Sequence, residues 1–174
     1  MANETIVRMK ISVIIFLVTS SLFAQKADGY LLFEQRNFDS DTCCWRKLQR
    51  EGKYNEAADM IIDFIENGNV SNRQSLNWHA AQMYAFSDDY KSALTYSRKT
   101  YNVFQKWFGG NDGKTWYYFA KGTSAFFERN KEKLRKIVQK WSKRLIPDKN
   151  LKELELLLAN WEFNYKRATS ANTR

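Results

Sequence analysis

The stretch GKYNEAADMII, residues 52–62, and the stretch DYKSALTYSRK, residues 89–99, decide the fold of this chain. Each contains a tyrosine that is followed three residues later by an alanine and then by a helical run. The apolar residues of both stretches recur at the three- and four-residue spacing of one helical face. Either the two stretches are copies of one repeat, or they are two similar amphipathic helices.

Composition favours an all-α fold for the whole chain. A length of 174 residues fits one compact domain, and the apolar fraction of 44% is close to the globular norm. The chain has one proline and seven glycines. A multi-stranded β-fold needs more turn residues than this, and runs of alternating apolar and polar residues are also scarce.

The helical period extends over most of the chain and predicts seven helices, over residues 38–50, 54–67, 73–87, 90–107, 115–129, 131–146 and 149–167. Short connections between helices make sequential neighbours pack antiparallel, so we expect stacked hairpins. The glycine-rich segment 109–113 predicts a loop. Residues 25–37 are expected to form an N-terminal extension, residues 38–168 the helical domain, and residues 169–174 a frayed tail.

The hairpins resemble tetratricopeptide repeats. In that family a unit of about 34 residues pairs two helices, with a small residue in the first and Tyr-x-x-Ala opening the second. Anchored on Tyr90 and Ala93, the second unit of this chain places Ala81 at the small position. In the first unit Tyr54 opens the second helix as expected, but Trp45 stands where a small residue belongs.

The third unit is degenerate, with Gly122 at the small position and Leu134 in place of the alanine. The resemblance covers residues 38–167 and implies an α-solenoid of about three hairpins, closed by a C-terminal capping helix over 149–167. A generic helical bundle is the alternative fold.

Members of this family are usually binding modules without chemistry, so the resemblance implies an adaptor that holds a protein or peptide. The family uses a concave surface lined by the first helix of each pair. Carried over to this chain, that surface comprises Arg46, Gln49, Trp78, Gln82, Phe119, Thr123 and Phe126. Alternatively, the three aromatic residues of this set belong to the core.

A second candidate surface is the basic segment RNKEKLRKIVQKWSKR, residues 129–144. Lysines at three- and four-residue spacing fall on one face, opposite the apolar stripe: Lys133, Lys136, Lys140 and Lys143. With the net charge of +9, such a row could bind an anionic glycan, a lipid headgroup or nucleic acid. The alternative is an ordinary solvated face.

No catalytic, metal or cofactor site is expected from the sequence. Cys43 and Cys44 are adjacent, so we expect unpaired thiols packed as small apolar side chains, with redox activity or an intermolecular bridge as the alternative. Two cysteines and the single His79 do not supply a four-ligand zinc site. A hydrolase would require folding to place His79 beside one of these cysteines.

The N-terminus predicts export. Arg8 and Lys10 precede an apolar run over residues 11–18, and Ala24 offers a small residue for cleavage. This pattern resembles bacterial signal peptides, so we expect residues 1–24 to be removed and the mature chain, without a membrane domain, to act in the periplasm or cell envelope. An uncleaved anchor is the alternative, although the run is short for a membrane span.

Overall fold

The computed structural model describes residues 28–144 and 148–170, and these residues confirm the predicted all-α class. The only β pairing among them is an isolated bridge between Glu34 and Asn69. The signal peptide expected over residues 1–24 lies outside the described residues. The elements are η1 (Asp28–Leu32, a 3-10 helix), α2 (Gln35–Phe38), α3 (Cys44–Arg50), α4 (Tyr54–Asn67), α5 (Arg73–Phe86), α6 (Tyr90–Arg98), α7 (Val103–Phe108), α8 (Gly110–Phe127), α9 (Lys131–Arg144), α10 (Lys149–Ala159) and α11 (Tyr165–Ser170).

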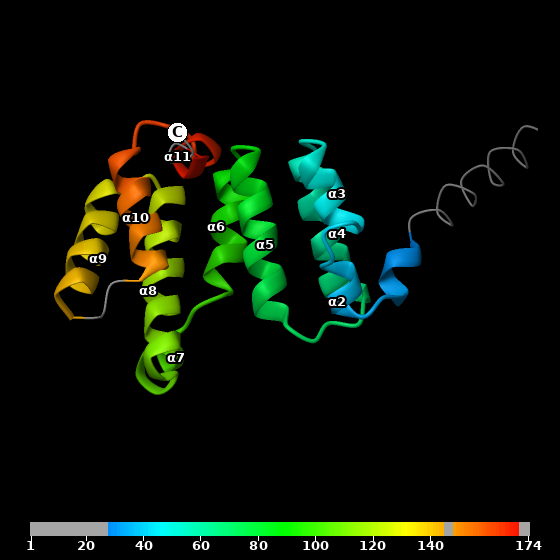
Figure 1. The fold of residues 1–174 in the computed structure, drawn as a ribbon, viewed down its shortest axis with the longest axis horizontal. Coiled ribbons are helices and arrows are strands. Elements are labelled where there is room, and N and C mark those ends of the chain that lie inside the picture. The colour runs from blue at the N-terminus through cyan, green and yellow to red at the C-terminus, as the bar shows by residue number, and fades with distance from the viewer. Residues whose placement is uncertain (1–27, 145–147, 171–174) are drawn as a thin grey trace, which may run out of the picture.

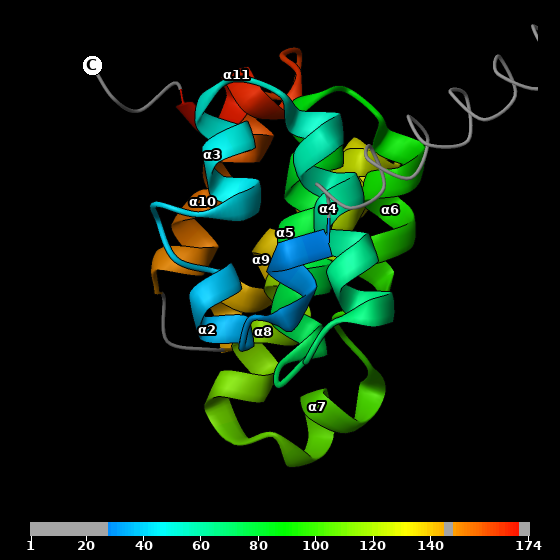
Figure 2. The same ribbon diagram turned by 90° about the vertical axis from the view of Figure 1, so that its right-hand side faces the viewer.

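Helices that follow one another in the sequence pack against one another, as the short connections predict. Contacts join α3 to α4, α4 to α5, α5 to α6, α6 to α8 and α8 to α9, and α10 packs on both α8 and α9. Figure 1 shows the resulting row, with α3 and α4 at one end and α9 and α10 at the other. In the perpendicular view α3 and α10 lie on one side of the row and α4 and α6 on the opposite side (Figure 2).

Side-chain caps explain where several helices begin. The Asn72 side chain accepts a hydrogen bond from the Ser75 amide at 3.0 Å and starts α5. The Asp89 side chain does the same for the Ser92 amide, also at 3.0 Å, and starts α6. Each cap satisfies an amide that has no partner within its helix, so these boundaries follow from local sequence.

The helix predicted over residues 90–107 is divided in the structure into α6 and α7. Asn102 caps α7 by accepting from the Gln105 amide at 3.0 Å, and the Gln105 side chain accepts from the Asn102 amide at the same distance. This reciprocal capping box starts a new helix where the apolar period had suggested continuity. Helix α7 then runs in its own direction and is held mainly against α8.

The loop predicted over residues 109–113 is also different, because α8 already begins at Gly110. Gly110 has φ +62°, a backbone conformation that glycine adopts without a steric penalty. A Cβ atom added to Gly113 would lie 2.5 Å from the carbonyl oxygen of Gln105. The glycines therefore make a tight reversal that brings α7 against the start of α8.

The helix predicted over residues 149–167 is interrupted after α10. The Asn164 side chain accepts from the Arg167 amide at 3.0 Å and starts α11. Helix α11 crosses to the earlier part of the chain, where the Tyr165 amide donates to the Tyr90 hydroxyl at 2.8 Å. The frayed tail predicted from residue 169 is wrong for Thr169 and Ser170, which belong to α11; residues 171–174 lie outside the described residues.

The helix predicted over residues 38–50 is divided into α2 and α3, and the prediction of unpaired thiols is wrong. Cys43 and Cys44 form a disulfide bond. Cys44 has φ +52°, so the chain turns sharply into α3 and brings the two sulfur atoms together. The prediction had assumed that neighbouring cysteines in ordinary backbone geometry could not pair.

Two apolar clusters hold the row of helices together. One is built mainly from α3, α4 and α5 and includes Trp45, Ile61 and Phe64. The other is built mainly from α8, α9 and α10 and includes Phe126 and Trp141. Aromatic side chains at the end of α5, Tyr84 and Phe86, pack against both clusters. The two clusters therefore meet at the end of α5.

Candidate binding surfaces

The predicted concave set divides into buried and accessible residues. Trp78 and Phe119 are only 7% and 5% exposed, and Thr123 and Phe126 are fully buried. The prediction that these four residues contact a partner is therefore wrong. The alternative, which assigned the three aromatic residues to the core, is confirmed. Arg46, Gln49 and Gln82 keep partial exposure.

The C-terminal segment explains this burial. The ring of Phe126 lies 5.2 Å from that of Trp161 and 6.0 Å from that of Tyr165. Helices α10 and α11 thus cover the face of α8 that the resemblance left open. Trp78 is covered in turn by Trp116, with ring centroids 5.1 Å apart. Sequence periodicity identifies these residues as apolar but does not show which later segment covers them.

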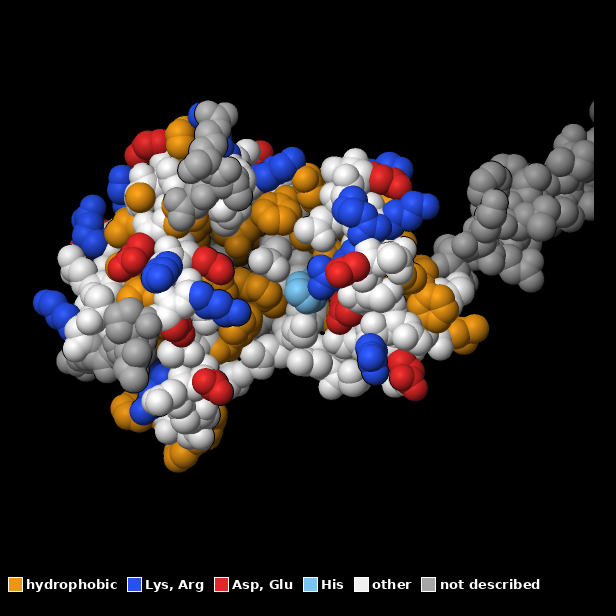
Figure 3. Space-filling model, viewed as in Figure 1, with side chains coloured by type: hydrophobic (Ala, Val, Ile, Leu, Met, Phe, Trp, Pro, Cys, Tyr) orange, Lys and Arg blue, Asp and Glu red, His pale blue; other side chains and the backbone are white. Residues whose placement is uncertain are grey.

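Arg46 and Gln49 line a pocket of about 710 Å³ between α3 and α11. Its wall holds three cations and two aromatic rings: Arg46, Arg50, Lys166, Tyr54 and Phe86. Asp41, Thr169 and Ser170 complete the lining. Figure 3 shows the face on which this part of the molecule is hollowed, between the end formed by α3 and the end formed by α10.

The cations of the α3–α11 pocket are held by local contacts. The Nε atom of Arg46 donates to the carbonyl oxygen of Asp39 at 2.9 Å, and its guanidinium lies 4.3 Å from the centre of the Trp45 ring. The ammonium of Lys166 lies 4.7 Å from the Tyr54 ring. A cation held over an aromatic ring is already ordered, so it loses little conformational entropy when it binds an anion. The pocket therefore suits a carboxylate.

His79 lies beside this region, on α5. Its ring centre is 4.9 Å from that of Trp45, and its Nε2 atom is 3.3 Å from the Ser75 hydroxyl. Burial lowers the pKa of His79, the charge of Asp39 raises it, and the charge of Arg46 lowers it further. The Ser75 contact, at a spacing of four residues on one helix, was missed by the sequence analysis. Cys43 and Cys44 are bonded to each other, so neither offers the thiol that the hydrolase alternative requires.

A second pocket, of about 550 Å³, lies along α8 and α9 and contains three of the four predicted lysines. We call it the lysine pocket. Its cations are Lys106, Lys121, Lys133, Lys136 and Lys140, and Glu132 is its one acidic side chain. Lys143 is exposed on α9 and does not line it. Lys106 and Lys121 come from α7 and α8, so only the packing of these helices could place them here.

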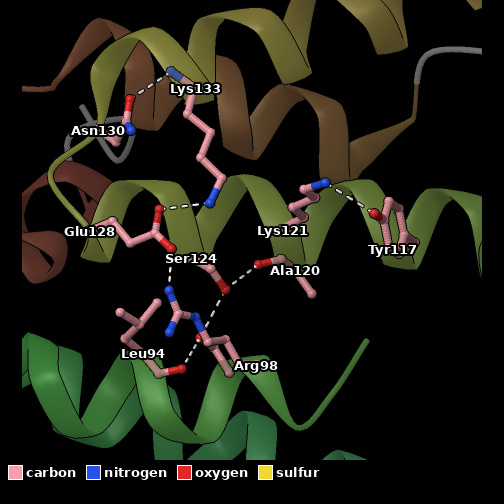
Figure 4. A network of polar contacts seen from close by, with 10 residues as sticks. Leu94, Arg98, Tyr117, Ala120, Lys121, Ser124, Glu128, Asn130 and Lys133 are labelled. Atoms are coloured by element: carbon pink, nitrogen blue, oxygen red, sulfur yellow. Dashed lines mark hydrogen bonds and ion pairs between the residues drawn. The ribbon is translucent and has the colours of Figure 1, made fainter. Parts of the chain in front are cut away.

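Neighbouring acids fix part of the lysine pocket. Glu128 accepts hydrogen bonds from Lys133 and from Arg98, both at 2.7 Å, and so links α6, α8 and α9 (Figure 4). Burial alone would raise the pKa of Glu128, but these two hydrogen bonds outweigh it and lower the pKa. Lys121 donates to the Tyr117 hydroxyl at 3.0 Å. Lys133 therefore shares Glu128 with Arg98, whereas Lys136 makes a longer pair with Glu132 at 3.6 Å.

A third pocket, of about 570 Å³, lies where the starts of α5, α8 and α10 meet α7. Gln105, Asp112 and Asp148 are among its polar lining residues, and none of the predicted site residues lines it. Within residues 28–144 and 148–170, no cluster of three or more His, Cys, Asp or Glu side chains is arranged to hold a metal ion.

Within the same described ranges, no helix has both the length and the apolar character needed to cross a bilayer.

No protein-family model matches this chain, and neither a curated protein nor a solved structure matches it.

Proposed function

We propose that this chain is a non-enzymatic binding module of the periplasm or cell envelope, built as a short tetratricopeptide-like array. The proposal is supported by the pairing of α3 with α4, α5 with α6 and α8 with α9, and by α10 covering the last pair. The small residues at the positions that the resemblance implies, Ala57, Ala81, Ala93 and Gly122, are all buried. Small side chains there allow the close helix approach that such arrays need.

The observation that carries the function is the α3–α11 pocket. Arg46, Arg50 and Lys166 lie around the Tyr54 and Phe86 rings, beside the surface implied for ligand binding. Arginine forms strong charge-assisted hydrogen bonds with carboxylates, and aromatic and arginine side chains dominate binding energy at interfaces. We therefore propose that the pocket holds an acidic side chain within an extended segment of a partner protein.

Binding to matched peptides tests this function. Acidic peptides with an apolar anchor should bind, and the same peptides with lysine in place of the acids should not. Arg50→Gln combined with Lys166→Gln removes two exposed cations and should weaken binding at least about tenfold, because hydrogen bonds to charged groups contribute about 1.5–3 kcal/mol each. Lys152→Gln on α10 is the matched control and should leave affinity unchanged. Equal affinity for acidic and basic peptides would refute the proposal.

The lysine pocket supports a second candidate function, the binding of an anionic ligand. Five lysines from three helices surround a cavity lined by one glutamate, and with Lys133 paired to Glu128 the remaining lysines leave the local charge positive. A glycan, lipid headgroup or nucleic acid phosphate held by such a site should lose affinity as salt rises, since salt screens exposed charges. A peptide in the α3–α11 pocket should keep the part of its affinity that its apolar anchor supplies. If binding of the anionic ligand persists at raised salt and in the variant with both Lys121→Gln and Lys140→Gln, this candidate function is excluded.

Export is supported by the disulfide between Cys43 and Cys44, because disulfides persist mainly in oxidising compartments such as the periplasm. The expected processing after Ala24 remains a prediction. Sequencing the N-terminus of the protein isolated from the periplasm tests it directly, and finding the protein in the cytoplasm with Met1 intact would refute it.

A further inference from the structure

Helix α7 carries the largest exposed apolar surface among the described residues. Val103, Phe104, Trp107 and Phe108 are 56%, 75%, 65% and 81% exposed. They lie at the spacing of one helical face, and the rings of Phe104 and Phe108 stack with centroids 6.2 Å apart. We call these four residues the aromatic tip. All of them except Phe108 fall within the helix predicted over residues 90–107, but that helix is interrupted before Asn102, so α7 can face away from the core.

Two other side chains of α7 fix the aromatic tip to the rest of the molecule. The Gln105 side chain donates to that of Gln74 on α5 at 2.8 Å. The ammonium of Lys106 lies 5.7 Å from the ring of Tyr117 on α8. Figures 1 and 2 show α7, together with the start of α8, projecting beyond the ends of the other helices, and Figure 3 shows hydrophobic atoms at that end. The tip is thus a fixed convex projection, whereas a docking groove for a helix or peptide is concave.

Lysines outnumber acidic residues in the segment that carries the aromatic tip. Residues 99–121 contain four lysines and one acidic residue, Asp112. One of these lysines, Lys106, belongs to α7 itself and lines the lysine pocket. The apolar tip and the lysine pocket therefore meet at Lys106 and form one continuous surface.

We propose that this surface docks the protein on an anionic phospholipid bilayer, with the aromatic tip in the interface and a headgroup phosphate in the lysine pocket. Tryptophan and phenylalanine beside lysines are the composition of segments that lie in the membrane interface without spanning it. Lysines near a charged leaflet add an attraction that salt screens. The proposal deepens the anionic-ligand candidate, on which it rests, by naming phospholipid as the ligand.

Trp107 makes the proposal directly measurable. Of the six tryptophans in the chain, Trp45, Trp78, Trp141 and Trp161 are buried and Trp116 is partly buried. Vesicles of equimolar phosphatidylcholine and phosphatidylglycerol should therefore shift the emission of Trp107 to the blue, and brominated acyl chains should quench it. Trp107→Phe should abolish the shift while the protein still sediments with the vesicles.

Variants separate insertion from charge. Changing Phe104, Trp107 and Phe108 together to serine should reduce vesicle partitioning at least about a hundredfold, because the three rings supply most of the apolar area that the tip would bury in the membrane. Every variant is made in the full chain, so residues 1–27 are the same in all of them. Vesicle binding through these residues would therefore persist in the serine variant. Leu32→Ser, which alters another exposed apolar residue on η1, is the matched control and should bind as the parent does.

Soluble pyrophosphate distinguishes the lipid from a free anion. The serine variant should still bind pyrophosphate, whereas Lys121→Gln with Lys140→Gln should lose both pyrophosphate and vesicles. If that lysine variant loses pyrophosphate but the serine variant keeps vesicle binding, the membrane inference fails and the anionic-ligand candidate stands. If neither probe binds the parent chain, both fail. Equal binding to pure phosphatidylcholine, or self-association that the serine change removes, would also overturn the inference.

Discussion

Replacing Gly122 tests how the array is closed. Gly122 is buried on α8, and a Cβ atom added there would lie 2.6 Å from the Cδ1 atom of Leu154 on α10. Ordinary contacts of a Cβ atom fall at 3.4–4 Å, so Leu154 would have to move by most of an ångström. Leu154 is fully buried and has little room to do so. The sequence analysis expected this glycine to matter within its own hairpin, but the structure assigns the contact to α10.

Two opposing effects set the magnitude for Gly122→Ala. Alanine improves helix propensity by about 1 kcal/mol relative to glycine, while an extra methyl group in a packed core costs about 1–3 kcal/mol. We expect a net loss of about 1 kcal/mol. Gly122→Leu adds three further carbon atoms and should cost about 3 kcal/mol or more, which lowers Tm by roughly 6–12 °C for a chain of this size.

The assay is urea denaturation followed by far-ultraviolet circular dichroism, with Leu154→Ala as the partner change. Leu154→Ala alone should cost about 2–5 kcal/mol, since it leaves a cavity. In that background Gly122→Ala should become neutral or stabilising, because the atom it meets has been removed, and the cycle should show a coupling of about 1–2 kcal/mol. If Gly122→Ala has the same effect in both backgrounds, the close approach of α8 and α10 is refuted.

Three further predictions concern other parts of the molecule. The pKa of His79 is lowered from its ordinary value of 6.5 by burial, so its contribution to stability is complete above pH 6.5 and is lost as pH falls through the lower folded value. His79→Gln should therefore flatten the acid side of a plot of urea midpoint against pH, and an unchanged profile would contradict this. Changing Lys136, Lys140 and Lys143 together to glutamine should leave Tm nearly unaltered, since all three are exposed; a variant that fails to fold would show that the face is buried. Asn102→Ala should lower the free energy of unfolding by about 1 kcal/mol through loss of the capping box, measured by urea denaturation, with no effect if α7 already unfolds independently.

Local patterns predicted the helices well where the apolar period was regular, with a side-chain cap for α5 and without one for α4. Helix α4, opened by Tyr54, has its predicted bounds, and α5 ends one residue before its predicted end. The prediction differed from the structure in two places. At Asn102 a capping box interrupts an apolar run. At Gly110, α8 begins inside a segment that was expected to be a loop. A period reports which face is apolar, but a single side-chain cap can end the helix that carries it.

The candidate sites were less predictable, because they depend on contacts between distant segments. Arg46 and Gln49 were identified through the resemblance, but their pocket is completed by Lys166 from α11. The lysine row on α9 was evident from spacing, yet Lys106 and Lys121 join it from other helices. The aromatic tip had no distinguishing sequence signal, since an apolar face is normally buried.

The amino-acid sequence by itself determined the all-α class, the starts of α4, α5, α6, α9 and α10, and the basic face of α9, because each depends on residues within a few turns of one another. Only the tertiary structure decided which apolar faces are covered. Phe126 is buried because Trp161 and Tyr165 return over it. Trp107 is exposed because α8 packs on another side of α7 and no described segment covers the side that carries Trp107. Burial depends on what packs against a face, and that partner can lie anywhere along the chain.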